Sequence, residues 1–156
     1  MAQALNLGQK VHFTGFVSSE DLPCLINSCD VFVMPSEAEL LSLASLEAMA
    51  CGRPMLAANA VALPELVTDG VNGYLFQPGD DADAERCMEK LADQPELWSA
   101  MGAASVERAQ PHGLEAILER NEALYEMVLS GKVSTEMDFS RHRKKKNSTS
   151  RDTSSA

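Results

Sequence analysis

Residues 30–54 read DVFVMPSEAELLSLASLEAMACGRP, and the order of patterns in this stretch decides the fold class. Residues 30–35 form a continuous apolar run closed by a proline, which predicts a strand buried on both faces. Residues 43–51 have helical spacing, and Gly52 is a typical residue just past the end of a helix. Residues 54–58 form a second apolar run. Strand, helix and strand in this order predict a βαβ unit, in which the strands are parallel.

The chain outside this unit continues the same alternation. We expect two more strands, and we expect Ser19 to be the N-cap of the first helix. The strands are expected at residues 11–17 and 74–76, and the helices at residues 19–26, 64–67, 82–93, 95–101 and 113–129. The last helix would present an apolar face made of Leu114, Ile117, Leu118, Leu124, Tyr125 and Val128. The fold class that follows is α/β, with a parallel sheet covered by helices on both faces.

The composition fits one globular domain followed by a tail. The chain has 156 residues, of which 45% are hydrophobic, and this is enough to bury a core. No apolar run reaches the roughly 18 residues that a membrane span needs, and the first residues lack the pattern of a secretory signal. The cysteines show no metal-binding or disulfide spacing, which favours free thiols in a reducing cytoplasm. They are Cys24, Cys29, Cys51 and Cys87.

Charge divides the chain into a body and a tail. Residues 1–138 hold 22 acidic and 7 basic residues, a net charge of −15, whereas residues 139–156 carry a net charge of +5. We therefore expect a folded domain over residues 1–132 and a disordered basic, Ser/Thr-rich tail over residues 133–156. The acidic body argues against nucleic acid as a partner. The basic residues 141–146 of the tail suggest contact with an anionic membrane surface, such as the inner face of a membrane, or with nucleic acid, but a tail that serves only solubility is the favoured interpretation.

The loop and helix that follow residues 30–35 carry the candidate chemistry. This loop lies at the carboxyl end of a strand, where parallel sheets bind their ligands. Ser42 is the expected N-cap of the helix, which would leave the amides of Leu43, Ala44 and Ser45 free at its positive end. Free amides at a helix amino terminus form an anion site that suits a phosphate group.

Two glutamates flank this helix terminus. Glu47 lies four residues after Leu43 on the same helix face, and Glu39 lies in the preceding loop. A carboxylate among apolar neighbours needs hydrogen-bond donors if it is buried, and the vicinal hydroxyls of a sugar supply two. On the residues alone, the alternative remains that both glutamates are ordinary exposed residues. Arg53 is the only positively charged residue close to this helix in the sequence that could compensate the charge of a phosphate.

Five motifs around these glutamates occur in a fixed order. They read Val-x-Phe-x-Gly (residues 11–15), Asp-Val-Phe-Val-x-Pro-Ser (30–36), Glu-Ala-Met-Ala-x-Gly-x-Pro (47–54), x-Pro-Glu-x-Val (63–67) and Asp-Gly-x-Asn-Gly-x-Leu-Phe-x-Pro (69–78). With the Glu-x7-Glu spacing of Glu39 and Glu47, they resemble the donor-binding domain of retaining nucleotide-sugar glycosyltransferases of the family 4 type. The resemblance covers roughly residues 9–80, with a helical continuation to about residue 130. It implies a Rossmann-like domain, the carboxyl-terminal half of a GT-B architecture.

The resemblance implies a role for each matching residue. Glu47 corresponds to the carboxylate that holds the nucleotide ribose, and Glu39 to the catalytic carboxylate that faces the transferred sugar. Backbone amides of the loop would contact sugar and diphosphate, and part of the first motif would line the base pocket. The loop residues are Leu40, Leu41, Ser42 and Leu43, and the base-pocket residues are Gly15 and Phe16. No cofactor or metal is implied, because Asp80, Asp81 and Asp83 suit a helix amino terminus better than a metal.

The sequence departs from the family pattern in one loop. Members commonly have Gly-Phe-Gly after the first glutamate, whereas this chain has Leu40, Leu41 and Ser42. Leucine restricts the close approach of backbone to ligand that glycine allows. A Glu-Leu-x-Ser loop is similar to that of some bacterial members that act on lipid or cell-envelope acceptors. We therefore expect the departure to affect the identity of the sugar more than the activity.

The resemblance also implies parts that this chain does not contain. Family members place an arginine and a lysine on the diphosphate, well before the first motif, and carry an acceptor-binding amino-terminal domain. We expect a fragment, inactive on its own, of an enzyme that moves a sugar from a nucleoside diphosphate to a hydroxyl with retention. Three alternatives stay open: a non-catalytic nucleotide-sugar-binding module, a sugar-nucleotide epimerase and a plain interaction domain.

Overall fold

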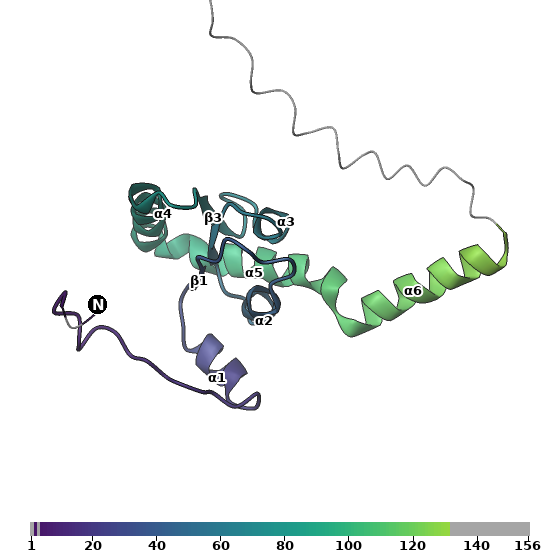
Figure 1. The fold of residues 1–156 in the computed structure, drawn as a ribbon, viewed down its shortest axis with the longest axis horizontal. Helices are drawn as coiled ribbons and strands as arrows, with labels where there is room; N and C mark the ends of the chain where they lie inside the picture. Colours follow the sequence, from purple (N-terminus) through teal and green to yellow (C-terminus); the bar gives the residue numbers. More distant parts are fainter. Residues whose placement is uncertain (1, 3, 132–156) are drawn as a thin grey trace, which may run out of the picture. The chain divides into compact units, whose positions relative to one another are not determined.

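The computed structural model describes residue 2 and residues 4–131 (Figure 1). These residues divide into two compact units, the first ending at Gly113 and the second beginning at Leu114. The tail that was expected to be disordered, residues 133–156, lies outside the described residues.

Helices and strands alternate through the first unit. In chain order the elements are α1 (Leu22–Asn27), β1 (Phe32–Met34), α2 (Leu43–Ala50), β2 (Met55–Ala58), α3 (Leu63–Leu66), β3 (Gly73–Phe76), α4 (Asp81–Asp93), the 3-10 helix η1 (Pro95–Leu97), α5 (Trp98–Ala109) and the 3-10 helix η2 (Gln110–His112). The second unit contains α6 (Leu114–Leu129).

The three strands form a parallel sheet in the order β1–β2–β3. In this register Val33 lies opposite Leu56, which lies opposite Tyr74 on the other side. All four side chains of β2 are buried, and they belong to the hydrophobic core. The α/β class with a parallel sheet, predicted from the βαβ pattern, is confirmed.

Helix α2 packs closely against α5 because glycines meet where they cross. A Cβ atom built on Gly102 of α5 would overlap the carbonyl oxygen of Gly52. Gly52 has a φ of 69°, and its N–H donates to the Met49 oxygen at 2.9 Å while the Arg53 N–H donates to the Ala48 oxygen at 3.0 Å. These two bonds form a Schellman motif, which ends α2 where the sequence predicted.

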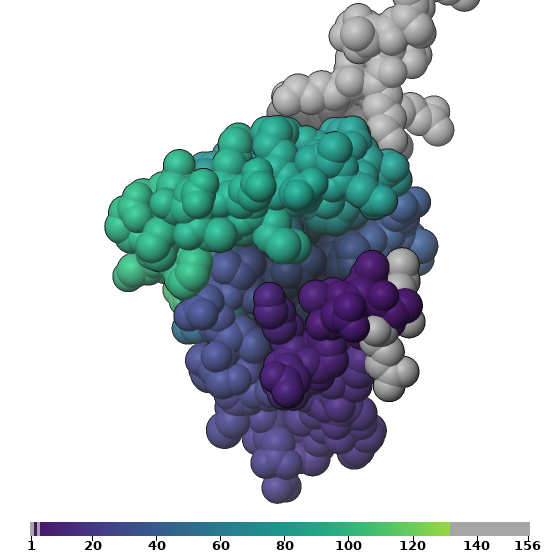
Figure 2. Space-filling view, turned by 90° about the vertical axis from the view of Figure 1, so that its left-hand side faces the viewer, coloured from purple at the N-terminus to yellow at the C-terminus, as the bar shows by residue number. Residues whose placement is uncertain are grey.

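The strand that was expected at residues 11–17 is absent from the described structure. This segment has no regular secondary structure, and its aromatic side chains Phe13 and Phe16 are 87% and 96% exposed. Figure 2 shows the N-terminal segment, in dark purple, on the outside of the molecule. A strand needs a neighbouring strand for its backbone hydrogen bonds, and β-propensity alone does not supply one.

Two further expectations about the first unit are wrong. Strand β1 is not buried on both faces: Val33 is 44% exposed, and Phe32 and Met34 are only partly buried. Ser19 is not the N-cap of α1: the N-cap residue is Asp21, whose side chain makes no capping bond, and the Asp21 N–H donates to the Ser18 hydroxyl at 3.1 Å. The four cysteines are free thiols, as expected.

Helix α6 forms over the predicted residues, but its apolar face stays exposed. None of its residues is buried, and Tyr125 is 66% exposed. None of the helices in residues 2 and 4–131 combines the length and the apolar character that crossing a bilayer requires.

Acidic residues cap the amino terminus of α4 and occupy its first turn, as the sequence predicted for Asp80, Asp81 and Asp83. The Asp80 carboxylate accepts from the Asp83 N–H at 3.0 Å. Asp83 in turn accepts from the Gln77 N–H at 2.8 Å and pairs with Arg86. The Gln77 amide, and then Arg86, hold the pKa of the Asp83 carboxyl below its ordinary value.

We predict that Gly102→Ala destabilises the first unit by about 1–3 kcal/mol, because the added methyl group forces α5 away from α2. Intrinsic helix propensity alone would give the opposite sign. Urea unfolding followed by circular dichroism measures the change. Gly8→Ala is the control, since a Cβ atom at Gly8 would meet nothing within 4 Å. Equal stability of the Gly102→Ala variant and the native chain would contradict the close crossing.

We predict that Asp83→Asn lowers the melting temperature at pH 7 and that the difference from the native chain disappears in acid. A carboxyl with a lowered folded pKa stabilises above its unfolded value of about 3.9, and this contribution is lost as the pH falls through the folded value. Thermal melts between pH 7 and pH 3 test this. Asp81→Asn, on the same first turn, is the matched control and should have a smaller effect. A difference that persists unchanged at pH 3 would contradict the electrostatic origin.

Candidate functional site

Three loops leave the carboxyl ends of the strands, and the middle one is bonded to the loop after β1 and to the end of β3. They are residues 35–42 after β1, residues 59–62 after β2 and residues 77–80 after β3. The Ala62 N–H donates to the Glu39 oxygen at 3.2 Å, and the Asn59 N–H donates to the Phe76 oxygen at 2.8 Å. The sheet therefore places the predicted glutamate loop at its carboxyl edge, where parallel sheets bind ligands.

The amino terminus of α2 is capped by Ser42, as predicted. The Ser45 N–H donates to the Ser42 hydroxyl at 3.4 Å, and this hydroxyl donates to the Ser45 hydroxyl at 2.9 Å. Both serines are buried. The expectation of three free amides is therefore wrong for Ser45, whose N–H is used by the cap. The amides of Leu43 and Ala44 have no acceptor within the described part of the chain, and they form the positive end of the helix.

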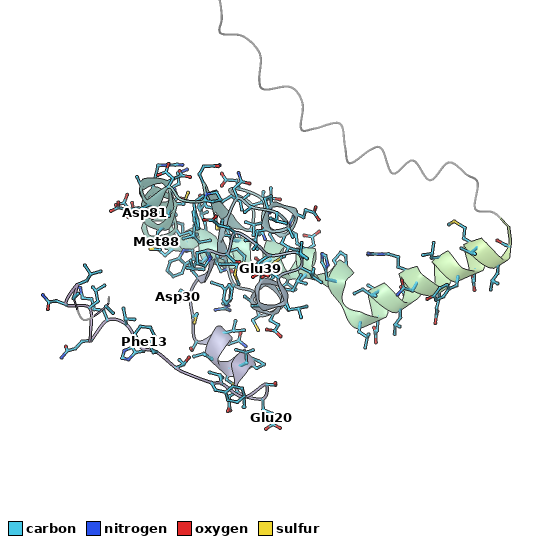
Figure 3. The ribbon with its side chains drawn as sticks, in the orientation of Figure 1. Phe13, Glu20, Asp30, Glu39, Asp81 and Met88 are labelled. Atoms are coloured by element: carbon cyan, nitrogen blue, oxygen red, sulfur yellow. The ribbon has the colours of Figure 1, made fainter. Side chains whose placement is uncertain are left out.

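Glu39 is half-buried and is fixed through its backbone. Its carbonyl oxygen accepts the bond from Ala62, whereas its carboxylate has no hydrogen bond or ion pair within residues 2 and 4–131. Figure 3 labels Glu39 in the body of the first unit. A carboxylate held by its backbone, with its oxygens uncommitted, is available to a ligand.

Glu47 is exposed on α2, so the burial that would have demanded donors is absent in the free chain. It stands one helical turn beyond Leu43, about 6 Å along the helix axis. Its side chain borders two cavities of about 270 and 240 Å³. The first is lined by Ser19, Leu22, Pro23, Ile26, Glu47, Ala50 and Cys51, and the second by Leu43, Leu46, Glu47, Ala50, Ala109, His112 and Gly113. Neither wall opposite α2 was identified from the sequence, because no motif marks which helices will pack beside one another.

The remaining predicted residues lie in two places. Leu40, Leu41 and Leu43 are 86%, 53% and 65% exposed around the capped helix terminus, so the loop presents apolar side chains beside its amides. Gly15 and Phe16 belong to the N-terminal segment and do not line the two cavities beside Glu47. Their assignment to the base pocket stays a prediction.

Arg53 does not approach the free amides. Its Nε donates to the Cys51 oxygen at 3.0 Å and its Nη1 to the Cys29 oxygen at 2.7 Å. It follows the carboxyl terminus of α2, the opposite end of the helix from Ser42. The guanidinium therefore fixes the chain before β2 and is not placed to neutralise a phosphate.

A larger cavity of about 410 Å³ lies between β3 and α4, but its carboxylates are already used. Besides the bonds of Asp80 and Asp83, the Asp69 carboxylate accepts from the Leu75 N–H at 3.0 Å. These hydrogen bonds hold the neighbouring loops against β3 and the start of α4. Within the described residues, no group of three His, Cys, Asp or Glu side chains is arranged to hold a metal ion.

Comparison with known proteins identifies the family to which this domain belongs. Residues 1–108 match the family described as glycosyl transferases group 1. The chain belongs to this family. The predicted resemblance to the donor-binding half of a GT-B glycosyltransferase is confirmed.

Curated relatives of this group 1 chain are much longer than the chain itself. The D-inositol 3-phosphate glycosyltransferase of Streptomyces griseus subsp. griseus is 35% identical over 130 residues, which cover 83% of this chain and 28% of the relative. The sulfoquinovosyl transferase SQD2 of Arabidopsis thaliana is 36% identical over 117 residues, which cover 73% of this chain and 23% of the relative. The chain therefore spans about a quarter of the length of these relatives.

Solved structures show the same fold. Sucrose-phosphate synthase from Thermosynechococcus elongatus superposes with a TM-score of 0.75 at 30% identity, covering 83% of this chain and 33% of that chain. HepE of Anabaena in complex with UDP has a TM-score of 0.70 at 28% identity, covering 83% and 35%. The group 1 chain is thus a Rossmann-like domain of the GT-B type.

We predict that Ser42→Ala lowers stability by about 0.5–2 kcal/mol, because the Ser45 N–H and hydroxyl lose their buried partner. Urea unfolding gives the magnitude. Ser99→Ala is the control, since Ser99 is exposed on α5. A Ser42→Ala variant as stable as the control would show that the cap is unimportant.

Proposed function

We propose that this chain is the nucleotide-sugar donor-binding part of a retaining glycosyltransferase, which transfers the sugar to an acceptor hydroxyl. The observation that carries the proposal is the arrangement around α2. Two free amides stand at its amino terminus, and the uncommitted carboxylate of Glu47 stands one turn further on, beside a cavity. The amides can donate hydrogen bonds to the oxygens of a diphosphate. The carboxylate can accept hydrogen bonds from the hydroxyls of a ribose or a sugar.

The diphosphate is assigned to the amino terminus of α2. Amides of Leu43 and Ala44 are fixed before a ligand arrives, because the Ser42 cap sets the first turn. Negative charge grows on the leaving diphosphate as the glycosidic bond breaks, and preorganised donors stabilise it. Removing one such donor from a comparable oxyanion site costs about 2.7–4 kcal/mol. No metal or cofactor is included in this proposal.

The nucleoside is assigned to the cavity between α1 and α2, with Glu47 on the ribose hydroxyls. The apolar side chains of Leu22, Pro23 and Ile26 suit the flat face of a base, and Ser19 offers a hydroxyl. Glu39 is assigned to the transferred sugar. Support for this class of donor comes from HepE, which was solved in complex with UDP and with UDP-glucose.

We base the proposed acceptor and the proposed localisation on features of the sequence. The Leu40-Leu41-Ser42 loop supports a lipid or cell-envelope acceptor, and the relatives are named for D-inositol 3-phosphate and sulfoquinovosyl transfer. We place the protein in the cytoplasm, with its basic tail directed at the inner face of the membrane. The findings give no support to the epimerase alternative.

We predict that Glu47→Gln weakens binding of UDP and UDP-glucose about tenfold to a hundredfold. Glutamine keeps one oxygen acceptor, so the variant loses about one charge-assisted hydrogen bond to the ribose, which contributes about 1.5–3 kcal/mol. Titration of the isotope-labelled chain by nuclear magnetic resonance measures the affinity and reports shifts at Leu43 and Ala44. Glu85→Gln is the matched control, because Glu85 is exposed on α4.

Three results of this titration are informative in different ways. Unchanged affinity of Glu47→Gln would remove the ribose assignment. Shifts that bypass the amides of Leu43 and Ala44 would remove the diphosphate assignment. Binding of neither UDP nor GDP by the native chain at millimolar concentration would contradict the proposed function as a whole.

A further inference from the structure

Val61 adopts a backbone conformation that its side chain disfavours. It has a φ of 46°, whereas valine strongly prefers extended backbone. The residue lies in the loop between β2 and α3, and its side chain is 60% exposed. Glycine or asparagine at this position would adopt the left-handed conformation with much less strain.

The rest of the loop explains how this conformation is held. The Asn59 N–H is bonded to Phe76 in β3, and the Leu63 N–H donates to the Ala60 oxygen at 3.1 Å. Ala58 and Leu63, on either side, are completely buried. Because both ends of the loop are fixed, the strain is concentrated at Val61.

The strained residue precedes the hydrogen bond that holds the candidate sugar-binding glutamate. The Ala62 N–H, in the peptide group that Val61 leads into, donates to the Glu39 oxygen at 3.2 Å. If Val61 relaxes to extended backbone, this peptide group rotates and the N–H turns away from Glu39. The preference of Val61 and the bond to Glu39 therefore oppose each other.

We propose that Val61 is a positioning residue, whose strain sets how firmly the loop that carries Glu39 is held at the carboxyl edge of the sheet. This inference rests on the proposed function, which assigns Glu39 to the transferred sugar. The strain lowers the free energy needed to open the Ala62–Glu39 bond of the free chain, although the bond is formed in the structure. A donor sugar that contacts Glu39 favours the closed arrangement, so part of its binding energy is used to close the loop.

The first test needs no ligand. Amide hydrogen exchange of Ala62 is measured by nuclear magnetic resonance in the native chain, in Val61→Gly and in Val61→Ile. Glycine removes the strain, so exchange should slow about tenfold, the factor that corresponds to the cost of a left-handed residue. Isoleucine is also β-branched and keeps the strain, so exchange should match the native chain. Equal or faster exchange in Val61→Gly would overturn the proposal.

The second test compares UDP-glucose with UDP on the same three proteins. Only the sugar reaches Glu39, so Val61→Gly should raise the affinity for UDP-glucose, by up to the same tenfold factor, and leave that for UDP unchanged. A purely structural role of Val61 would not change this ratio. An unchanged ratio in Val61→Gly would overturn the link to the sugar.

The two proposals can fail separately. If the native chain binds neither nucleotide, the proposed function fails, while the exchange of Ala62 still decides whether Val61 controls the loop. If UDP binds with the expected dependence on Glu47 and the ratio stays constant, only the role of Val61 is rejected.

Discussion

Burial of strand β2 is the constraint on which the rest of the structure depends. All four of its side chains are buried, and its backbone pairs with β1 on one edge and β3 on the other. Gly73 allows β3 to lie this close, since a Cβ atom there would overlap the backbone of Met55. Because all three strands are parallel, their loops leave at one edge, and this alone brings Glu39, Ala62 and the amino terminus of α2 together.

Features encoded in a short stretch of sequence could be predicted, because the interactions that make them are local. Ser42 caps a helix whose first turn includes its partner Ser45, and Gly52 ends the same helix through bonds to the preceding turn. Asp80 and Asp83 act within one turn of α4. The family motifs identified the candidate site for the same reason, since they concentrate in these loops and helix ends.

Features that depend on distant neighbours could not be predicted from the same patterns. Residues 11–17 have the composition of a strand, but composition does not supply the neighbouring backbone that a strand requires. The burial of β1 depends on its place in the sheet, and the cavity beside Glu47 depends on α1 packing near α2. The strain at Val61 has no signal in the sequence, because a left-handed valine is stabilised only by the fixed ends of its loop.

The electrostatics of the proposed donor site depend on which contacts the positively charged side chains of the first unit make. Four of the five side-chain cations described in the first unit, all except Lys10, are committed to structural contacts. Arg53 donates to the Cys29 and Cys51 oxygens, Arg86 pairs with Asp83, Arg108 donates to the Glu65 and Leu66 oxygens, and Lys90 lies over the ring of Tyr74. None of these contacts involves the amino terminus of α2. The positive potential at the amino terminus of α2 therefore comes from its backbone amides. These amides lie in a body, residues 1–138, whose net charge is −15.

Amides and mobile cations contribute differently to such a site. Backbone N–H groups at a capped helix terminus are fixed by the fold, so they need no reorganisation when charge develops on a leaving group. Their partial charge is small, about half an elementary charge over the whole terminus, and it acts only over the first turn. Amides of this kind suit the orientation of a diphosphate better than its capture from solution. Capture of a diphosphate against a strongly acidic body requires full positive charges. In the proposed nucleotide-sugar site, the amides at the start of α2 therefore orient the diphosphate, whereas its capture from solution needs full charges.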